Sequence, residues 1–321
     1  MKKRTKITLL VASILLVTGL MICAAALASE DHSVFQWNTE EFEVNTQTIT
    51  EAFSNIRIHT AEADIRLMPA TDGVCRVEHP ESKYTGYDII VQDGLLAIEY
   101  RNTRKWYQFK IDFYVPNREV RVYLPQSQYD ALMLHTASGD IAVDLGVAYQ
   151  TAKFSTASGD IACHAKVAES CDIQTASGTI LLHDTGTVGS VHIGSASGDC
   201  TVTNLESGSF YMKSTSGDAV LTNIAAEDFT AHTVSGEMRL SNCLGQKMSL
   251  ECTSGDIQFV NCDGKDITIT TVSGDVEGSF ASPKLFESHT TSGDISLPRS
   301  EATDSRCTVK TTSGDVEIDI A

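Results

Sequence analysis

Thr-Ala-Ser-Gly-Asp-Ile occupies residues 136–141 of the chain, and the same six residues return at 156–161. Ten copies of this pattern, each built around Ser-Gly, fill residues 131–321, and consecutive serines lie 19 to 21 residues apart. A fixed period of this length indicates one structural unit stacked on itself rather than the core of a globular enzyme. The repeated serines are Ser138, Ser158, Ser177, Ser197, Ser216, Ser235, Ser254, Ser273, Ser292 and Ser313.

Apolar residues alternate with polar ones on both sides of each serine. Met248 and Leu250 stand six and four positions before Ser254, and Ile257 and Phe259 stand three and five positions after it. Apolar residues two apart indicate one buried face of a β-strand. Four consecutive copies carry asparagine seven positions after the serine, which indicates a second corner with its asparagines outside: Asn204, Asn223, Asn242 and Asn261. Each repeat is therefore predicted to hold two short strands and two corners.

The first corner of each repeat is the Ser-Gly-Asp segment itself. Glycine adopts positive φ without strain, and serine and aspartate side chains bond to local backbone groups, so the segment predicts a tight turn. The glycines assigned this structural role are Gly139, Gly159, Gly178, Gly198, Gly217, Gly236, Gly255, Gly274, Gly293 and Gly314.

One such coil cannot bury its apolar face alone, but stacked coils can, with each strand pairing about 4.8 Å from its equivalent in the next coil. An additional first coil is predicted at Ile56–Leu67, which aligns without a gap with Leu132–Val143. We therefore expect an all-β fold, a single-stranded parallel β-solenoid of about eleven coils of 19–20 residues. Analogy with the common class of β-helix favours a right-handed one.

The rest of the chain divides by composition. Residues 7–28 carry no charge and follow four basic residues, so they are expected to be a transmembrane anchor or a cleaved signal peptide, and both alternatives stay open. The expected segments are a cytoplasmic basic segment at 1–6, the anchor or signal peptide at 7–28, a linker or first cap strand at 29–52, the first coil plus a β-rich cap insertion at 53–130, and the ten-repeat β-solenoid at 131–321.

The insertion contains a hairpin signal, because alternating runs at Tyr87–Val91 and Leu95–Tyr100 are joined by Gln92-Asp93-Gly94. We expect it to cover the N-terminal end of the stack. The other end shows no such cap, since Val316–Ala321 still follows the strand pattern. The last strand of the sequence is therefore expected to form the edge of the stack, either open to a partner or protected by its charges.

The net charge of −18 makes nucleic acid and anionic lipid poor partners, and cationic groups or divalent metals better ones. Several of the nine cysteines fall on inward positions, where cysteine acts as a small apolar residue. Cys243 and Cys262 occupy equivalent places in adjacent repeats. We expect them to be reduced and buried, although their predicted spacing also permits a disulfide.

An acidic residue follows most of the corner glycines and is predicted to point outward. Ca²⁺ could bridge successive carboxylates of this ladder, with Asp256, Asp275 and Asp294 as the candidates. The alternative is that each aspartate bonds amides of its own turn, and it is favoured because one carboxylate per turn supplies too few oxygens for Ca²⁺. We assign no metal ligand, cofactor or catalytic residue, because a catalytic site normally interrupts a repeat. His59, His135, His232 and His289 share one outward position and are expected to be solvated.

Three features together resemble the bacterial DUF4097 family, whose members are often described as candidate adhesins. They are the repeated Thr-x-Ser-Gly-Asp-Ile/Val, the pair Ile56-Arg57-Ile58 and Ala63-Asp64-Ile65, and Tyr-Asp-x-Leu-x-Leu at Tyr129–Leu134. The resemblance covers the chain from about Phe53 to its C-terminus. It implies a β-solenoid on the extracytoplasmic side of the membrane, and some members look like membrane-anchored products of envelope-stress operons. It brings no catalytic residues.

These observations favour an exported, cell-surface, adhesin-like binding or scaffold protein without catalytic activity. It is expected to be extracytoplasmic, either anchored in the membrane through residues 7–28 or secreted, and to bind an envelope protein or a glycan rather than nucleic acid. Two alternatives remain: a membrane-anchored sensory or regulatory protein of the cell envelope, and a carbohydrate-active β-helix enzyme.

Overall fold

The computed structural model describes residues 42–104, 118–299 and 303–321. Every regular element in these ranges is a β-strand, and they contain no helix with the length and apolar character to span a bilayer. The basic segment predicted at 1–6 and the anchor or signal peptide predicted at 7–28 lie outside the described residues.

The strands form one hydrogen-bonded network. Seven precede the first serine repeat: β1 (Glu43–Ile49), β2 (Asn55–His59), β3 (Asp64–Pro69), β4 (Cys75–Glu81), β5 (Thr85–Gln92), β6 (Leu95–Asn102) and β7 (Glu119–Leu124). The regular stack follows: β8 (Gln128–Thr136), β9 (Ile141–Val143), β10 (Ala148–Ser158), β11 (Ile161–Cys163), β12 (Lys166–Ser177), β13 (Ile180–Ser197), β14 (Cys200–Ser216), β15 (Ala219–Ser235), β16 (Met238–Ser241), β17 (Leu244–Ser254), β18 (Ile257–Ser273) and β19 (Val276–Phe280). The last four are β20 (Leu285–His289), β21 (Ile295–Ser296), β22 (Arg306–Lys310) and β23 (Val316–Ile320).

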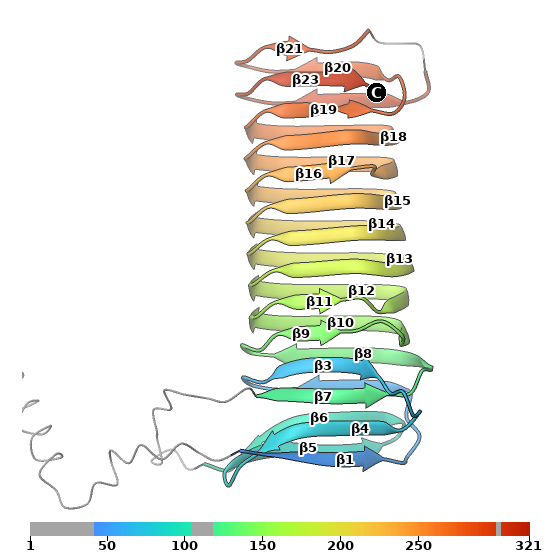
Figure 1. Cartoon of the computed structure of the whole chain (residues 1–321). Helices are drawn as coiled ribbons and strands as arrows, with labels where there is room; N and C mark the ends of the chain where they lie inside the picture. Colours follow the sequence, from blue (N-terminus) through green and yellow to red (C-terminus); the bar gives the residue numbers. More distant parts are fainter. Residues whose placement is uncertain (1–41, 105–117, 300–302) are drawn as a thin grey trace, which may run out of the picture. The chain divides into compact units, whose positions relative to one another are not determined.

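From β8 to β19 the coils stack in sequence order, and each strand runs parallel to its equivalent in the next coil (Figure 1). The register follows the repeat, so that Met248 pairs with Ile267 and Leu250 with Ile269. The all-β parallel solenoid predicted from the serine spacing is confirmed.

The core lies inside the coils and consists of ladders of equivalent apolar side chains. Phe210 and Phe229, six positions before their serines, are each 1% exposed, and their ring centroids lie 5.0 Å apart. Burying a side chain of this size contributes roughly 1.5–3 kcal/mol. Because each ring is covered by the coils above and below, a single repeat would lose most of this contribution.

Each coil contains three strand segments, so the prediction of two was incomplete. Leu205, Glu206 and Ser207 pair with Ile224, Ala225 and Ala226 of the next coil, and this third ladder continues through β17 and β18. It lies between the asparagine corner and a third corner near Gly208, and β14 contributes to all three ladders. The segment has only three residues of mixed character, too few to show a period of two.

The first coil and its cap are as predicted. Ile56 pairs with Leu132 and Ile65 with Ile141, which is the register of the gapless alignment. Strands β6 and β7 pair in parallel with the other side of β2 and β3. The predicted hairpin is β5–β6, whose turn residue Asp93 has φ 52°. Strand β4 pairs antiparallel with β7, and β1 with β4, beyond the parallel coils.

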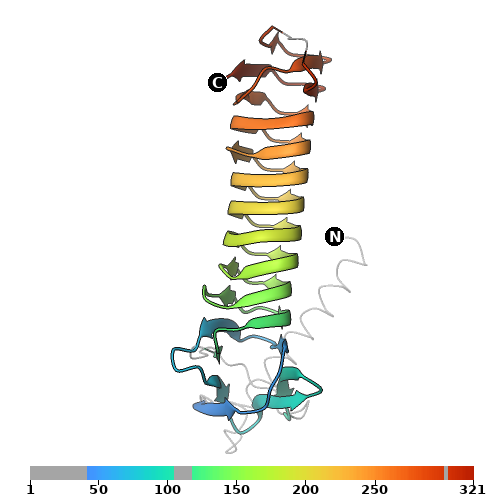
Figure 2. The same cartoon turned by 90° about the vertical axis from the view of Figure 1, so that its right-hand side faces the viewer.

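The C-terminal end differs from the prediction. Strand β22 lies between β18 and β20, and β23 lies between β19 and β21 (Figures 1 and 2). The last strands of the sequence are therefore inside the stack, and the edge is the coil of β20 and β21. The expectation that Val316–Ala321 forms the edge was wrong, because all repeats present similar core positions and their pattern does not encode their order.

Candidate functional site

The corner glycines stack directly on one another. A Cβ on Gly255 would lie 2.2 Å from the carbonyl oxygen of Gly236, and each of the ten predicted glycines would meet a backbone oxygen of a neighbouring layer at 2.1–2.3 Å. Eight of them also have φ between 129° and 157°, which other residues rarely adopt. Close contact between coils is thus a second reason for glycine here, which the sequence pattern alone did not indicate.

The acidic ladder joins successive coils through backbone amides. The amide of Asp275 donates to Asp256 Oδ1 at 2.9 Å, and the amide of Asp315 donates to Asp275 Oδ1 at 2.8 Å. Six further bonds of 2.7–2.9 Å follow the same scheme, with acceptors Asp64, Asp140, Asp160, Asp199, Asp218 and Asp315. These carboxylates bond the next coil in space and not their own turn, which is where the sequence interpretation placed the bond.

The calcium candidates of this ladder are not consecutive in space. Asp256 and Asp275 are neighbours, but Asp315 lies between Asp275 and Asp294. In the part of the chain that the structure describes, no group of three or more His, Cys, Asp or Glu side chains is placed to hold a metal ion. The geometry assigns these carboxylates to hydrogen bonding between coils.

The asparagine corner has the expected ladder. Asn204, Asn223, Asn242 and Asn261 have φ between 52° and 56°, in the left-handed region that asparagine tolerates. Each side-chain amide donates to the preceding rung at 2.7–3.0 Å, beginning with Asn204 Nδ2 to Asp184 Oδ1. Because every rung is both turn and inter-coil bond, the ladder holds this corner in register.

The eight cysteines within the described ranges are buried and unbridged. Burial raises the pKa of the Cys163, Cys200 and Cys307 thiols to about 12, so they are protonated at neutral pH. Cys243 and Cys262 lie on adjacent coils as predicted, and a hydrogen bond between their side chains raises the pKa of Cys243 and lowers that of Cys262.

Two of the four outward histidines are brought together. The ring centroids of His59 and His135 lie 4.8 Å apart, and His135 Nδ1 is 2.7 Å from Ser155 Oγ. Partial burial, followed by the charge of His59, lowers the pKa of His135. His232 lies on another coil, with its Nδ1 3.2 Å from a carboxylate oxygen of Glu251.

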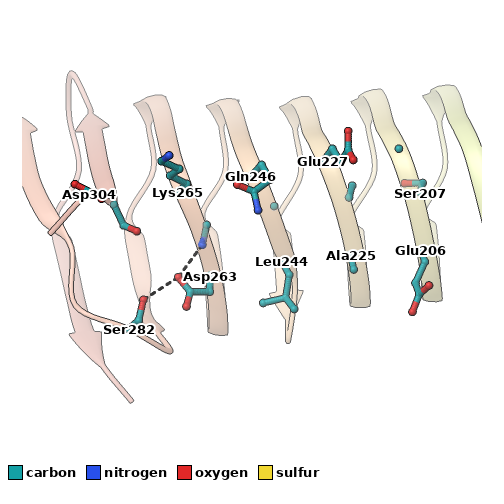
Figure 3. A pocket seen from close by; sticks show the side chains of 15 residues that line it. Glu206, Ser207, Ala225, Glu227, Leu244, Gln246, Asp263, Lys265, Ser282 and Asp304 are labelled. Carbon is teal, nitrogen blue, oxygen red and sulfur yellow. Dashed lines mark hydrogen bonds between the residues drawn. The ribbon is translucent and has the colours of Figure 1, made fainter.

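A groove of about 810 Å³ runs beside the third ladder over five successive coils (Figure 3). One side is a row of residues nine positions after the serines: Glu206, Ala225, Leu244, Asp263 and Ser282. The other side is the third corner: Gly208, Glu227, Gln246 and Lys265. Between them lie the small residues Ser207, Ala226, Gly245 and Gly264, and Asp304 and Ser305 line the C-terminal end.

Small residues between the two rows create the groove. A Cβ on Gly264 would meet the carbonyl oxygen of Gly245 at 2.6 Å, so no larger residue fits where these two layers touch. Ser207 lies between the same rows, and its buried Oγ has no hydrogen-bond partner among the described residues. Leu244 is 50% exposed and provides an apolar contact halfway along.

A buried ion pair fixes the C-terminal end of the groove. Lys284 is fully buried, and its Nζ donates to Asp263 Oδ1 and to Ser282 Oγ, the latter at 2.6 Å. Burial acts to raise the pKa of Asp263, but hydrogen bonds from Lys284, Ser282 and the Gly264 amide outweigh it and the pKa is lowered. Lys284 lies on the connector from β19 to β20, the segment that passes the inserted coil of β22 and β23.

The groove offers recognition chemistry at a regular spacing. Carboxylates of Glu206 and Glu227, the amide of Gln246 and the ammonium of Lys265 belong to successive coils, about 4.8 Å apart. Such a series suits hydrogen bonding to an extended molecule lying along the stack. The sequence interpretation missed this site, although a signal was present: the tenth residue after the serine is small in four consecutive repeats.

Comparisons with known proteins give remote structural similarities. The chain is similar to a candidate adhesin from Parabacteroides merdae (11% identity, 88% of this chain and 96% of that one, TM-score 0.34). It is similar to a candidate lipid-binding protein from Parabacteroides distasonis (12%, 87% and 97%, TM-score 0.39) and to a candidate adhesin from Bacteroides fragilis (12%, 88% and 98%, TM-score 0.34). No curated protein matches the sequence. TM-scores this low carry no argument about the function of this chain.

The family comparison is specific. The sequence model of the Toastrack DUF4097 family matches residues 53–203 and again residues 180–321. The two matches together extend from the first coil to the last residue, and they include every serine repeat and the cap. The chain belongs to the Toastrack DUF4097 family.

Proposed function

We propose that the protein is a non-catalytic, adhesin-like binding protein of the bacterial cell surface that holds an extended ligand along the groove of the third ladder. The observation that carries the proposal is the groove itself, because equivalent positions of five successive coils line it. A linear polymer meets a similar set of contacts at each coil, so many weak contacts add to a useful affinity.

The ligand is an envelope glycan or an extended segment of an envelope protein. Glu206, Glu227 and Gln246 accept hydrogen bonds from hydroxyl or amide groups, and Leu244 contacts an apolar face. The net charge of −18 disfavours phosphate-rich polymers.

Export is part of the proposal. The four basic residues followed by the uncharged residues 7–28 support passage into or across a membrane. The groove then faces the extracytoplasmic space, where envelope polymers occur.

The test fills the groove at its centre. Ala225→Trp places a large side chain between Glu206 and Leu244, and Ala162→Trp makes the same change on an outward position of β11, away from the groove. The full-length protein and both variants are applied to an array of bacterial envelope polysaccharides and to immobilised envelope proteins. Thermal unfolding checks that the variants are folded.

We expect Ala225→Trp to weaken binding at least about tenfold, as a central contact does, and Ala162→Trp to leave it unchanged. Equal binding by all three proteins would show that the groove is not the binding site. Leu244→Ala, which removes an exposed side chain without adding bulk, provides a second variant that tests the same contact.

A further inference from the structure

The outermost C-terminal coil exposes positions that are core positions everywhere else. Ile295 is 41% exposed, whereas Val316, its neighbour in the next coil, is 2% exposed and Val276 is 0% exposed. Leu285, at the start of β20, is 50% exposed. No described residue forms a further coil on this side, so the end of the apolar core faces solvent.

The same coil carries a free strand edge. Strand β20 pairs with β22 alone. Leu285 N donates to Ser305 O, and His289 O accepts from Thr311 N, so the backbone groups of these residues face β22. Backbone direction alternates along a strand, and Ser288 therefore presents its N–H and C=O to the open side. Free edges of this kind pair readily with another strand.

We propose that two copies of the chain dimerise end to end, with β20 of one copy pairing antiparallel with β20 of the other. The twofold axis passes through Ser288, and the two Ser288 residues exchange both backbone hydrogen bonds. A twofold contact of one patch with itself is the commonest way in which soluble proteins form dimers.

The charges of β20 select this register. With the axis at Ser288, Glu287 of each copy lies opposite His289 of the other, which places a carboxylate next to an imidazole twice. With the axis at Glu287, the two Glu287 carboxylates would lie opposite each other and repel. Strand β20 is therefore complementary to itself in one register.

The other end explains why the assembly would stop at two. Strands β4, β5 and β1 cover the parallel coils there through antiparallel pairs, and the outermost strand β1 is mostly polar. A head-to-tail contact would need an open parallel edge at both ends. One open end per copy gives a closed dimer and not a fibre.

The first test is the mass of the full-length protein in detergent, measured by analytical ultracentrifugation. We expect the wild type to be dimeric and Ser288→Pro to dissociate at least about tenfold more readily, because proline removes the outward N–H while the β20–β22 bonds remain. A monomeric wild type overturns the proposal. A dimer that Ser288→Pro does not weaken overturns it as well, since association then occurs elsewhere.

Charge variants test the register without touching the backbone. His289→Glu places carboxylates opposite each other and is expected to weaken the dimer, whereas Glu287→Lys combined with His289→Glu restores opposite charges and the dimer. Ser288→Cys is expected to form a disulfide between copies under mild oxidation, and Ser249→Cys, on an outward position of the middle coils, is not. Equal cross-linking of the two cysteine variants would contradict the assigned contact.

Discussion

The two ends of the solenoid use the same device with different outcomes. At the N-terminal end, β2 and β3 lie inside β6 and β7, although they precede them in sequence. At the C-terminal end, β22 and β23 lie inside β20 and β21, although they follow them. In both places the chain passes over one layer and returns to fill it. Only the N-terminal end then continues into antiparallel strands that cover the outer layer, within the described ranges.

This difference separates two tasks of an end coil. Reversing the chain order holds the returning segment from both sides, so a segment next to the end does not fray alone. Covering the last layer is a separate task, and it needs strands that do not offer a parallel edge. The exposed Ile295 and Leu285 show the result of the first device without the second.

The largest effect that would test the comparison comes from removing residues 303–321. Strands β20 and β21 pair only with β22 and β23. We therefore expect residues 285–297 to lose amide-exchange protection together with the deleted coil, measured by hydrogen–deuterium exchange and mass spectrometry. The control removes only residues 319–321. Retained protection of 285–297 would mean that β20 can dock directly on β18 and that order reversal is not required.

Replacing a corner glycine compares the middle with the open end. Gly255→Ala places a methyl group against the Gly236 carbonyl inside the regular stack and is expected to lower the free energy of unfolding by about 4 kcal/mol. Gly293→Ala makes a similar clash with Gly314, but the end coil can separate locally, so a loss of about 1–2 kcal/mol is expected. Denaturant unfolding measures both, and equal losses would show that the end coil is as strongly coupled as the middle.

Lys284 tests the connector that makes the C-terminal reversal possible. Lys284→Met leaves the Asp263 carboxylate without its cation and is expected to cost about 3 kcal/mol of stability in denaturant unfolding. Lys265→Met changes an exposed lysine of the same groove and should stay within about 0.5 kcal/mol of the wild type. Combining Lys284→Met with Asp263→Asn should recover part of the loss. A purely additive double variant would show that the pair does not interact.

The smallest expected effect is an opposite pH dependence at the two ends. Burial raises the pKa of Asp64 above 3.8, and the charges of Asp140 and Glu119 act in the same direction. The contribution of Asp64 to stability therefore falls as pH rises above 3.8 through the folded pKa. Asp263 has a lowered pKa, so its contribution is present above 3.8 and is lost as pH falls below that value.

Unfolding curves of Asp64→Asn and Asp263→Asn, measured from about pH 2.5 to about pH 6, check these signs. The difference between wild type and Asp64→Asn should decrease with rising pH, and the difference for Asp263→Asn should decrease with falling pH. Parallel curves for the two variants would show that neither carboxyl is perturbed as described.

Much of the fold could be predicted because each repeat states its own core. The alternation around Ser254, the asparagine corner and the alignment of Ile56 with Leu132 each define a register that the structure reproduces. The order of the last two coils could not be predicted, because Ser292 follows Ser273 at the regular spacing of 19 residues. Core positions alone fit either order.

The groove was beyond the sequence for a different reason. Its residues, such as Glu206 and Ser207, lie in a three-residue segment without a period, and their value depends on the neighbours in space. The role of Asp275 was assigned to its own turn because a local bond is the simplest one for an aspartate beside glycine. Stacking brings the next amide within 2.8 Å, and this distance exists only once the coils are assembled.

The reversed order of the last coils also has a consequence in time. As a chain is synthesised from its N-terminus, the coils from β8 to β19 can be added one by one, each on a finished neighbour. Residues 285–299 emerge next but have no finished surface to join, since their partner strands β22 and β23 are made later. The open end is therefore the last part of the molecule to form, and its apolar residues remain unassembled until the final residues of the chain arrive.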